Sequence, residues 1–260
     1  MSLETHVDRA IDRSTAEREA IEAKRNAYDR FLDRISDVRA ESVAASAPGS
    51  KTTLGARFSS SDGARRTVRR AFAETVRPHS VDDVDAEGES LLVTVRHELG
   101  ESVALALAPT TDTPFSPQVR SAVVDAVEDR QTETKVLARA LEREAVHLRE
   151  VKATVEEATD WVAAADETPL SNLGFDELAD RHETLATHRE RCAERIRERQ
   201  SFLNDTTGSA ADVAVRHHSV VGYLYQESPT DYPALDVLVR LENLCATCQE
   251  AVRDHLVRRA

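Results

Sequence analysis

Two cysteines three residues apart, Cys245 and Cys248, form the one pair in the chain whose spacing suits a metal ion or a redox disulfide. Two thiolates at i and i+3 on a helix could share a metal, with His255 or His217 completing the site. The alternative is core packing, because both cysteines continue an apolar stripe of the last expected helix, where a free thiol acts as a small apolar group. Core packing is favoured, since a thioredoxin-like pair needs a preceding strand that the sequence does not indicate.

Histidines are the next candidates for chemistry. His217 and His218 are adjacent, so on a helix their side chains diverge by about 100°, and we expect one to face the core and the other the solvent. His182 lies on an expected apolar seam, where a neighbouring carboxylate can satisfy its ring. We find no catalytic motif, and the sequence therefore predicts a non-enzymatic protein with no catalytic residue, no cofactor and no metal ligand.

A basic stretch lies between Lys51 and His79, with seven basic and two acidic residues. Five of its arginines lie within 63–77, namely Arg65, Arg66, Arg69, Arg70 and Arg77. On a helix over 63–77 they could follow a phosphate backbone, which makes a nucleic-acid-binding regulator one hypothesis. Pairing with the acidic segment 82–101 is the favoured alternative, because high salt would weaken phosphate binding steeply.

Composition limits the class of protein. The chain has 260 residues and a net charge of −13, and only four of its 34 basic residues are lysines. An acidic, arginine-rich chain is typical of a salt-adapted cytoplasm, because carboxylates keep a protein surface hydrated when salt screens its charges. A GC-rich genome, which favours arginine codons, is the other explanation for the arginine content.

The charged N-terminal 45 residues predict no signal peptide, and the lack of an 18-residue apolar run predicts no membrane span. Three cysteines, an odd number, fit a reducing cytoplasm.

The element that must organise these groups is a long helix over about 117–167. Ser116 is a good N-cap and Pro117 suits the first helical position. From Val123 to Ala165, alternating steps of four and three visit thirteen positions, of which ten are apolar. A 3.5-residue repeat of this length indicates a coiled-coil seam on a helix about 75 Å long, which needs the rest of the chain or a second copy to cover it.

The remaining pattern predicts further helices and a loop. A second seam runs from Leu3 to Val38, and residues 46–61 are small and polar. The other expected helices lie at about 2–45, 63–77, 89–107 with a break near Gly100, 175–204, 210–226 and 233–258. Together they predict an all-α fold, an elongated antiparallel coiled-coil helical bundle with a small helical cap. Its segments are an N-terminal coiled-coil helix at 1–45, a loop and short-helix insert at 46–116, and a long-helix bundle at 117–260.

Polar residues interrupt both seams, and we expect them to set register or partner choice. They are Ser14, Glu17 and Lys24 in the first helix, and Arg130, Thr134 and Glu144 in the long helix. An antiparallel arrangement of the two helices is favoured and would hold the two sets apart. A parallel one would bring Lys24 near Glu144, or Arg130 near Glu17.

The C-terminal part carries a family resemblance. Five segments resemble an uncharacterised family of helical, coiled-coil-rich proteins from halophilic archaea. They are Tyr-Leu-Tyr-Gln at 223–226, Asp-Tyr-Pro at 231–233, Val-Arg-Leu-Glu at 239–242, the run 251–256 and, earlier in the chain, Phe-Ser-Pro at 115–117. The resemblance implies the source and the helical architecture, and no functional residues. From the long seams we expect an interaction or scaffold protein whose partner is another protein or a second copy, with nucleic acid less favoured and no membrane contact.

Overall fold

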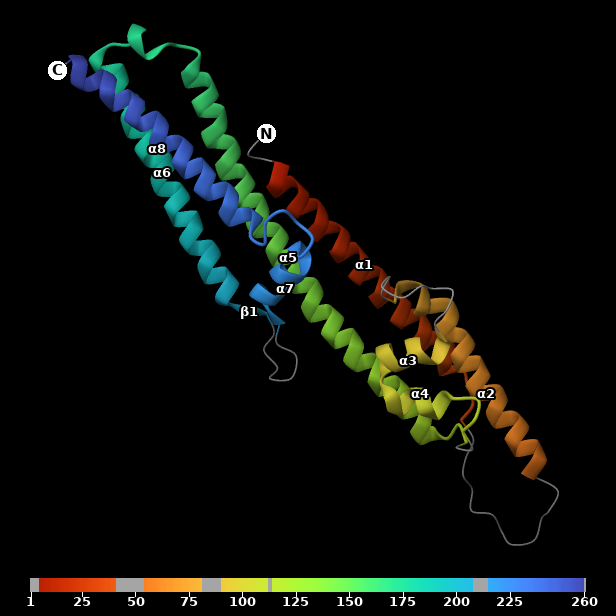
Figure 1. Ribbon diagram of the computed structural model, residues 1–260. Helices are drawn as coiled ribbons and strands as arrows, with labels where there is room; N and C mark the ends of the chain where they lie inside the picture. The colour runs from red at the N-terminus through yellow and green to blue at the C-terminus, as the bar shows by residue number, and fades with distance from the viewer. Residues whose placement is uncertain (1–4, 41–53, 81–89, 112–113, 208–214, 260) are drawn as a thin grey trace. The chain divides into compact units, whose positions relative to one another are not determined.

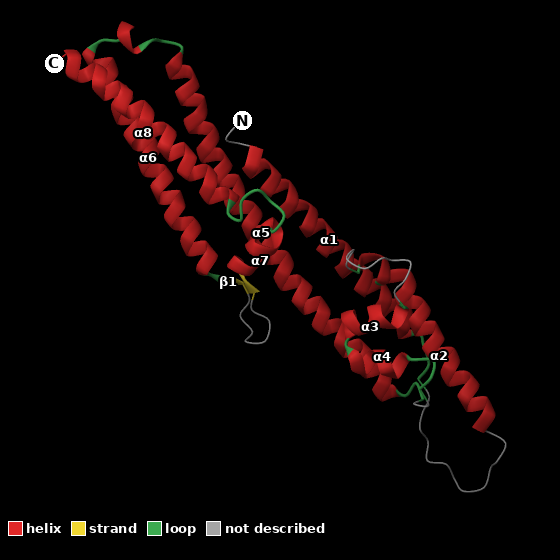
Figure 2. Cartoon of the chain, viewed as in Figure 1, coloured by secondary structure: helices red, strands yellow, loops and turns green. Residues whose placement is uncertain are grey.

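The computed structural model describes residues 5–40, 54–80, 90–111, 114–207 and 215–259, and this part of the chain is almost entirely helical (Figure 2). Its helices are α1 (Thr5–Ser36), α2 (Leu54–Thr75), α3 (Leu91–Leu99), α4 (Glu101–Leu107), α5 (Pro117–Asp166), α6 (Phe175–Asn204), α7 (His217–Tyr225) and α8 (Pro233–Arg259). Two short 3-10 turns, η1 (Arg77–His79) and η2 (Leu170–Asn172), complete them. The predicted all-α class is confirmed.

The long helix α5 starts where its capping signal lies. The backbone N–H of Val119 donates to Ser116 Oγ at 3.4 Å, and Pro117 is the first helical residue. The expected helices 117–167, 175–204 and 233–258 correspond to α5, α6 and α8 within one residue at each end. The break near Gly100 is also confirmed. Gly100 has a φ of +88°, a backbone conformation that favours glycine, and it separates α3 from α4.

Two predicted boundaries in the N-terminal part are wrong. The first helix ends at Ser36 rather than near residue 45, because Val38 folds back into the core and the Arg120 guanidinium donates to the Ser36 carbonyl at 2.7 Å. Residues 41–45 lie outside the described part. Helix α2 begins at Leu54, inside the predicted loop 46–61, because a run of serines without proline carries only a modest helix penalty.

The predicted helix 210–226 is also corrected. Residues 208–214 lie outside the described part, and α7 begins only at His217. Before it, β2 (Val215–Arg216) pairs antiparallel with β1 (Thr206–Thr207), a two-residue ladder that joins the two ends of this connection. The His217 N–H then donates to the Asp205 carbonyl at 3.1 Å, which fixes where α7 can start.

The chain forms two compact units. Unit 1 comprises Met1–Arg18 and Val136–Ala260, and unit 2 comprises Glu19–Lys135. Helices α1 and α5 each contribute residues to both units, so this division cuts across the three segments 1–45, 46–116 and 117–260.

In unit 1, α6 and α8 lie side by side against the C-terminal part of α5 (Figure 1). Arg189 of α6 donates to Glu242 and Gln249 of α8 at 2.8 and 2.9 Å. The start of α1 also packs here, since the Lys152 ammonium donates to Asp8 and the Ser14 hydroxyl to the Leu141 carbonyl. The core includes many side chains at the predicted seam positions, among them Leu141, Leu148, Val151, Val155, Leu178, Leu185, Leu238 and Leu241.

In unit 2, a second core lies among the end of α1, α2, α3, α4 and the start of α5. Phe31 of α1 and Phe72 of α2 meet edge to face at 5.7 Å between ring centroids. Val95, Leu107 and Val127 are buried in the same cluster, together with Tyr28. The predicted seam positions of α1 and α5 thus supply much of this core as well.

Candidate interaction pocket and the buried polar clusters

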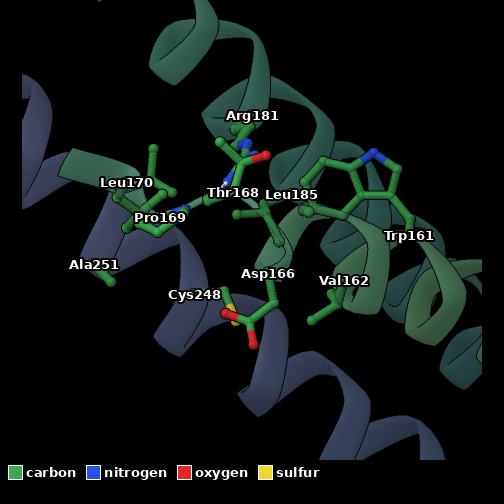
Figure 3. Close-up of a pocket in the computed structure, with 12 residues that line it drawn as sticks. Trp161, Val162, Asp166, Thr168, Pro169, Leu170, Arg181, Leu185, Cys248 and Ala251 are labelled. Atoms are coloured by element: carbon green, nitrogen blue, oxygen red, sulfur yellow. Dashed lines mark hydrogen bonds between the residues drawn. The ribbon is translucent and has the colours of Figure 1, made fainter. Parts of the chain in front are cut away.

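An apolar pocket of about 180 Å³ lies at one end of unit 1, where the turn between α5 and α6 meets α8 (Figure 3). Its walls are mainly Trp161 of α5, Leu170 of η2, Leu185 of α6 and Val252 of α8. Four lining residues are themselves exposed and form the rim, namely Asp166, Thr168, Pro169 and Ala251. An apolar cavity with an exposed rim can accept a ligand or a partner side chain without unfolding the bundle.

Hydrogen bonds hold the turn that forms the pocket. The Arg181 guanidinium donates to the Thr168 carbonyl at 3.2 Å, and that of Arg259 to the Ser171 carbonyl at 2.5 Å. The Gly174 N–H donates to Glu177 Oε2 at 2.7 Å, which caps the start of α6. These contacts fix the end of α8 against the turn, so the walls from three helices are positioned together.

Two of the cysteines, Cys192 and Cys245, are core residues, and the third, Cys248, lines the pocket. Burial raises the pKa of Cys245 and of Cys192 to about 11. Burial and then the Asp166 carboxylate raise the pKa of Cys248. Thiols with raised pKa values are poor nucleophiles and poor metal ligands at neutral pH.

The histidines divide as the sequence predicts. His217 is fully buried, and its ring lies 4.2 Å from that of Phe202. His218 is exposed, with Nε2 2.9 Å from the Tyr232 hydroxyl. His182 and His255, both partly exposed, lie elsewhere on α6 and α8, and the His182 carbonyl accepts from Gln249. Among the described residues, no group of three or more His, Cys, Asp or Glu side chains is placed to hold a metal ion.

Unit 1 contains a buried polar cluster, called here the Glu144 cluster. The Arg199 guanidinium donates two hydrogen bonds to the Glu144 carboxylate, at 2.6 and 2.8 Å, and both side chains are 1% exposed. The Tyr225 hydroxyl donates to the same carboxylate at 2.9 Å, and burial raises the pKa of that phenol. The Phe202 ring lies 5.1 Å from the guanidinium carbon of Arg199. Helices α5, α6 and α7 are therefore joined at one carboxylate.

Unit 2 contains a cluster of the same chemistry, called here the Glu98 cluster. Lys24 Nζ and the Tyr28 hydroxyl donate to the two Glu98 carboxylate oxygens at 2.7 and 2.6 Å. Burial alone would raise the pKa of Glu98, but the hydrogen bonds from Lys24 and Tyr28 outweigh burial and hold it below its ordinary value. Arg130 of α5 donates to the backbone carbonyls of Glu98 and His97 at 2.7 and 2.8 Å.

The arginine-rich helix α2 uses half of its central arginines inside unit 2. Arg65 donates to the Thr111 carbonyl at 2.7 Å and Arg69 to the Leu107 carbonyl, the last of α4, at 2.6 Å. Arg66 and Arg70 are exposed and pair with Asp62 and Glu74 of their own helix. Among the described residues, these four arginines are thus paired with backbone carbonyls and with α2 itself, and residues 82–89 of the expected partner segment 82–101 lie outside the described part.

Sequence reasoning did not identify the pocket, Glu98, or the partners of Glu144. One signal for Arg199 was present, because it lies on the predicted seam of 175–204. A hairpin with its turn near residue 170 places position 199 opposite Glu144. Glu98 and the pocket had no such signal, since α3 and η2 meet their neighbours only through tertiary packing.

The fold and site thus describe an all-helical protein with an apolar pocket and two buried polar clusters. The chain belongs to the family described as a domain of unknown function (DUF7260), whose model matches residues 5–249. Searches of curated proteins and of solved structures found no match. Within the described residues, no helix combines the length and the apolar character needed to cross a membrane.

Proposed function

We propose that this protein is a non-enzymatic helical interaction protein, and that the pocket at the α5–α6 turn is its binding surface for an apolar side chain of a partner protein. The observation that carries the proposal is the pocket itself, about 180 Å³ with walls from three helices that hydrogen bonds hold in place. Binding surfaces commonly concentrate their affinity in one apolar or aromatic side chain that enters such a pocket.

The size of the pocket suits one side chain. Apolar cavities of about 150 Å³ in protein interiors bind a benzene ring, so about 180 Å³ accommodates one aromatic or branched aliphatic group. The groups of the site favour binding over chemistry. Its thiol, Cys248, has a raised pKa, and the Arg181 guanidinium is engaged with the Thr168 carbonyl.

The long helices supply the scaffold in this proposal. We infer that their seams form the elongated antiparallel coiled-coil bundle expected from the sequence. The direction is supported inside each unit, in unit 2 by the hydrogen bonds from Arg120 to the Ser36 carbonyl and from Gln131 to the Asp29 carboxylate. In unit 1, Asp8 and Ser14 of α1 meet Lys152 and Leu141 of α5, so residue numbers rise along one helix as they fall along the other. The acidic, lysine-poor composition supports a salt-adapted cytoplasm as the setting.

The two other hypotheses have less support. A nucleic-acid regulator would use α2, but Arg65 and Arg69 bond to carbonyls of unit 2 and leave Arg66 and Arg70 as the exposed central pair. A metal or redox site would use Cys245 and Cys248, but Cys245 is buried in the core, and the described residues place no third His, Cys, Asp or Glu side chain with the pair to hold a metal ion.

The test is affinity capture of tagged protein from its native host, at the salt concentration of that cell. Ala251→Phe places a ring at the exposed rim and should fill the pocket, while Ala193→Phe makes the same change at an exposed position of α6 outside it. We expect a partner that wild-type protein and Ala193→Phe retain and Ala251→Phe loses. Equal recovery by all three proteins would contradict a role for the pocket.

A further inference from the structure

We propose that the partner of the pocket is a second copy of this chain, in a two-fold symmetric dimer in which Phe175 of each copy enters the pocket of the other. The inference rests on the proposed function, because it names the occupant of the same pocket. Two observations at this end of unit 1 carry it: an apolar group placed to fill a pocket, and charges of both signs arranged to meet each other.

The apolar group is Phe175, the first residue of α6, which is 54% exposed. It lies six residues before Arg181, a pocket-lining residue of the same helix, which is about 9 Å along the helix axis. Val257 of α8, 71% exposed, lies five residues beyond Val252 of the pocket wall. One end of the unit thus carries both a cavity for a ring and exposed apolar groups, the combination that a two-fold interface needs in order to pair a surface with itself.

The charges at this end have the same self-complementary character. The start of α6 and the preceding turn carry exposed acidic side chains, namely Asp166, Glu167, Asp176 and Glu177. The last turn of α8 carries exposed Arg258 and Arg259. The hydrogen bond from Arg259 to the Ser171 carbonyl brings the basic and acidic groups to one end. A two-fold axis through this end sets the basic side of each copy against the acidic side of the other, and such complementarity fixes orientation.

At high salt the apolar contact and the charges contribute differently to the dimer. Salt screens the exposed charges, so the affinity comes from the apolar contact while the charges select the orientation. It also screens the repulsion between two chains that each carry a net charge of −13. Because salt screens both the attraction across the interface and the net repulsion, we expect the apolar contact to keep the dimer together in molar salt.

The test is sedimentation velocity of the full chain over a wide concentration range in molar potassium chloride. Phe175→Ser removes the inserted ring, and Ala251→Phe blocks the pocket that receives it. Leu105→Ser is the matched control, because Leu105 is a large apolar residue of unit 2 that is 62% exposed. We expect a wild-type dimer whose dissociation constant rises at least tenfold in Phe175→Ser and in Ala251→Phe and is unchanged in Leu105→Ser.

Two results would overturn the inference. One is a wild-type protein that stays monomeric at every concentration, and the other is a dimer that neither Phe175→Ser nor Ala251→Phe weakens. The proposed function is judged separately. A monomer that still captures a host protein in an Ala251-dependent way would refute self-pairing and leave the proposed function in place, whereas capture that all variants retain would count against the pocket itself.

Discussion

The Glu144 cluster and the Glu98 cluster both neutralise a buried carboxylate, but they use different cations. Each buries a glutamate, and each gives it a tyrosine hydroxyl and one basic side chain. In unit 1 the base is Arg199, which pairs with both carboxylate oxygens and is 1% exposed. In unit 2 it is Lys24, which bonds one oxygen and is 15% exposed.

The difference follows from where each carboxylate lies. Glu144 belongs to the middle of α5, where a planar guanidinium can satisfy both oxygens without water. Glu98 belongs to the last turn of α3, where the helix dipole disfavours a negative charge. Lys24 and Arg130 offset that charge, and Arg130 also binds the exposed carbonyls of the helix end. The Glu144 cluster is therefore closed to solvent, whereas the Glu98 cluster caps a helix.

The largest effect is expected at the Glu144 cluster. Glu144→Leu leaves the Arg199 guanidinium buried without its carboxylate and should lower the free energy of unfolding by about 3–5 kcal/mol. The fluorescence of Trp161, the only tryptophan of the chain and a residue of unit 1, follows this loss in urea.

A compensating variant provides the control. Glu144→Leu combined with Arg199→Met removes both charges, and replacement of a buried ion pair by apolar groups is often neutral or stabilising. We expect the double variant to recover most of the loss. If it were as unstable as Glu144→Leu alone, the cost would come from packing and not from an unpaired charge.

The Glu98 cluster should respond less. Glu98→Leu removes the carboxylate, but Lys24 can extend its ammonium into solvent and Arg130 keeps its carbonyl acceptors. We expect a loss of about 1–2 kcal/mol in urea unfolding followed by circular dichroism. A loss equal to that of Glu144→Leu would mean that the two clusters are equally closed to water.

The pH dependence of unit 1 should depend on His217. Burial, and then the Arg143 charge, lower its pKa from 6.5 to about 4, although Glu144 and Asp205 oppose this shift. Above pH 6.5 the ring is neutral in both states; between pH 6.5 and 4 only the unfolded chain gains the proton, so stability falls as the pH falls.

His217→Phe removes this titration. We expect the wild type to lose on the order of 2 kcal/mol more than His217→Phe between neutral pH and pH 4, measured by Trp161 fluorescence in urea at each pH. His218→Phe changes an exposed neighbour and should leave the wild-type profile in place. Parallel profiles for wild type and His217→Phe would show that the buried ring does not control acid stability.

The smallest effects are expected on α2. Arg66→Gln and Arg70→Gln remove exposed pairs within the helix, and each should leave the thermal midpoint almost unchanged, because solvent screens such pairs. Arg69→Gln removes a donor from the last carbonyl of α4 and should cost about 1 kcal/mol in thermal unfolding followed by circular dichroism. Equal effects at all three positions would contradict the assignment of Arg69 as a structural contact.

Helical periodicity predicted the long elements because their signal is local. Ser116, Pro117 and the seam determine α5 residue by residue, and the glycine at position 100 indicated the break between α3 and α4. The end of α1 at Ser36 was missed, because it depends on Arg120, which is 84 residues away in sequence. The partners of the Glu98 carboxylate, Lys24 and Tyr28, are 70 residues or more away in sequence. The pocket walls Trp161 and Val252 are 91 residues apart, so local patterns do not reveal either site.

The thiol of Cys248 reports directly on whether a protein side chain occupies the pocket. Cys248 lines the pocket, while Cys192 and Cys245 are buried and serve as internal references. The rate of alkylation at Cys248 is measured by mass spectrometry in dilute protein, in concentrated protein and in the presence of any captured partner. We expect Cys248 of the wild type to become protected on concentration or on addition of the partner, and Phe175→Ser to show no protection on concentration. An alkylation rate that is the same under all three conditions would contradict occupancy of the pocket.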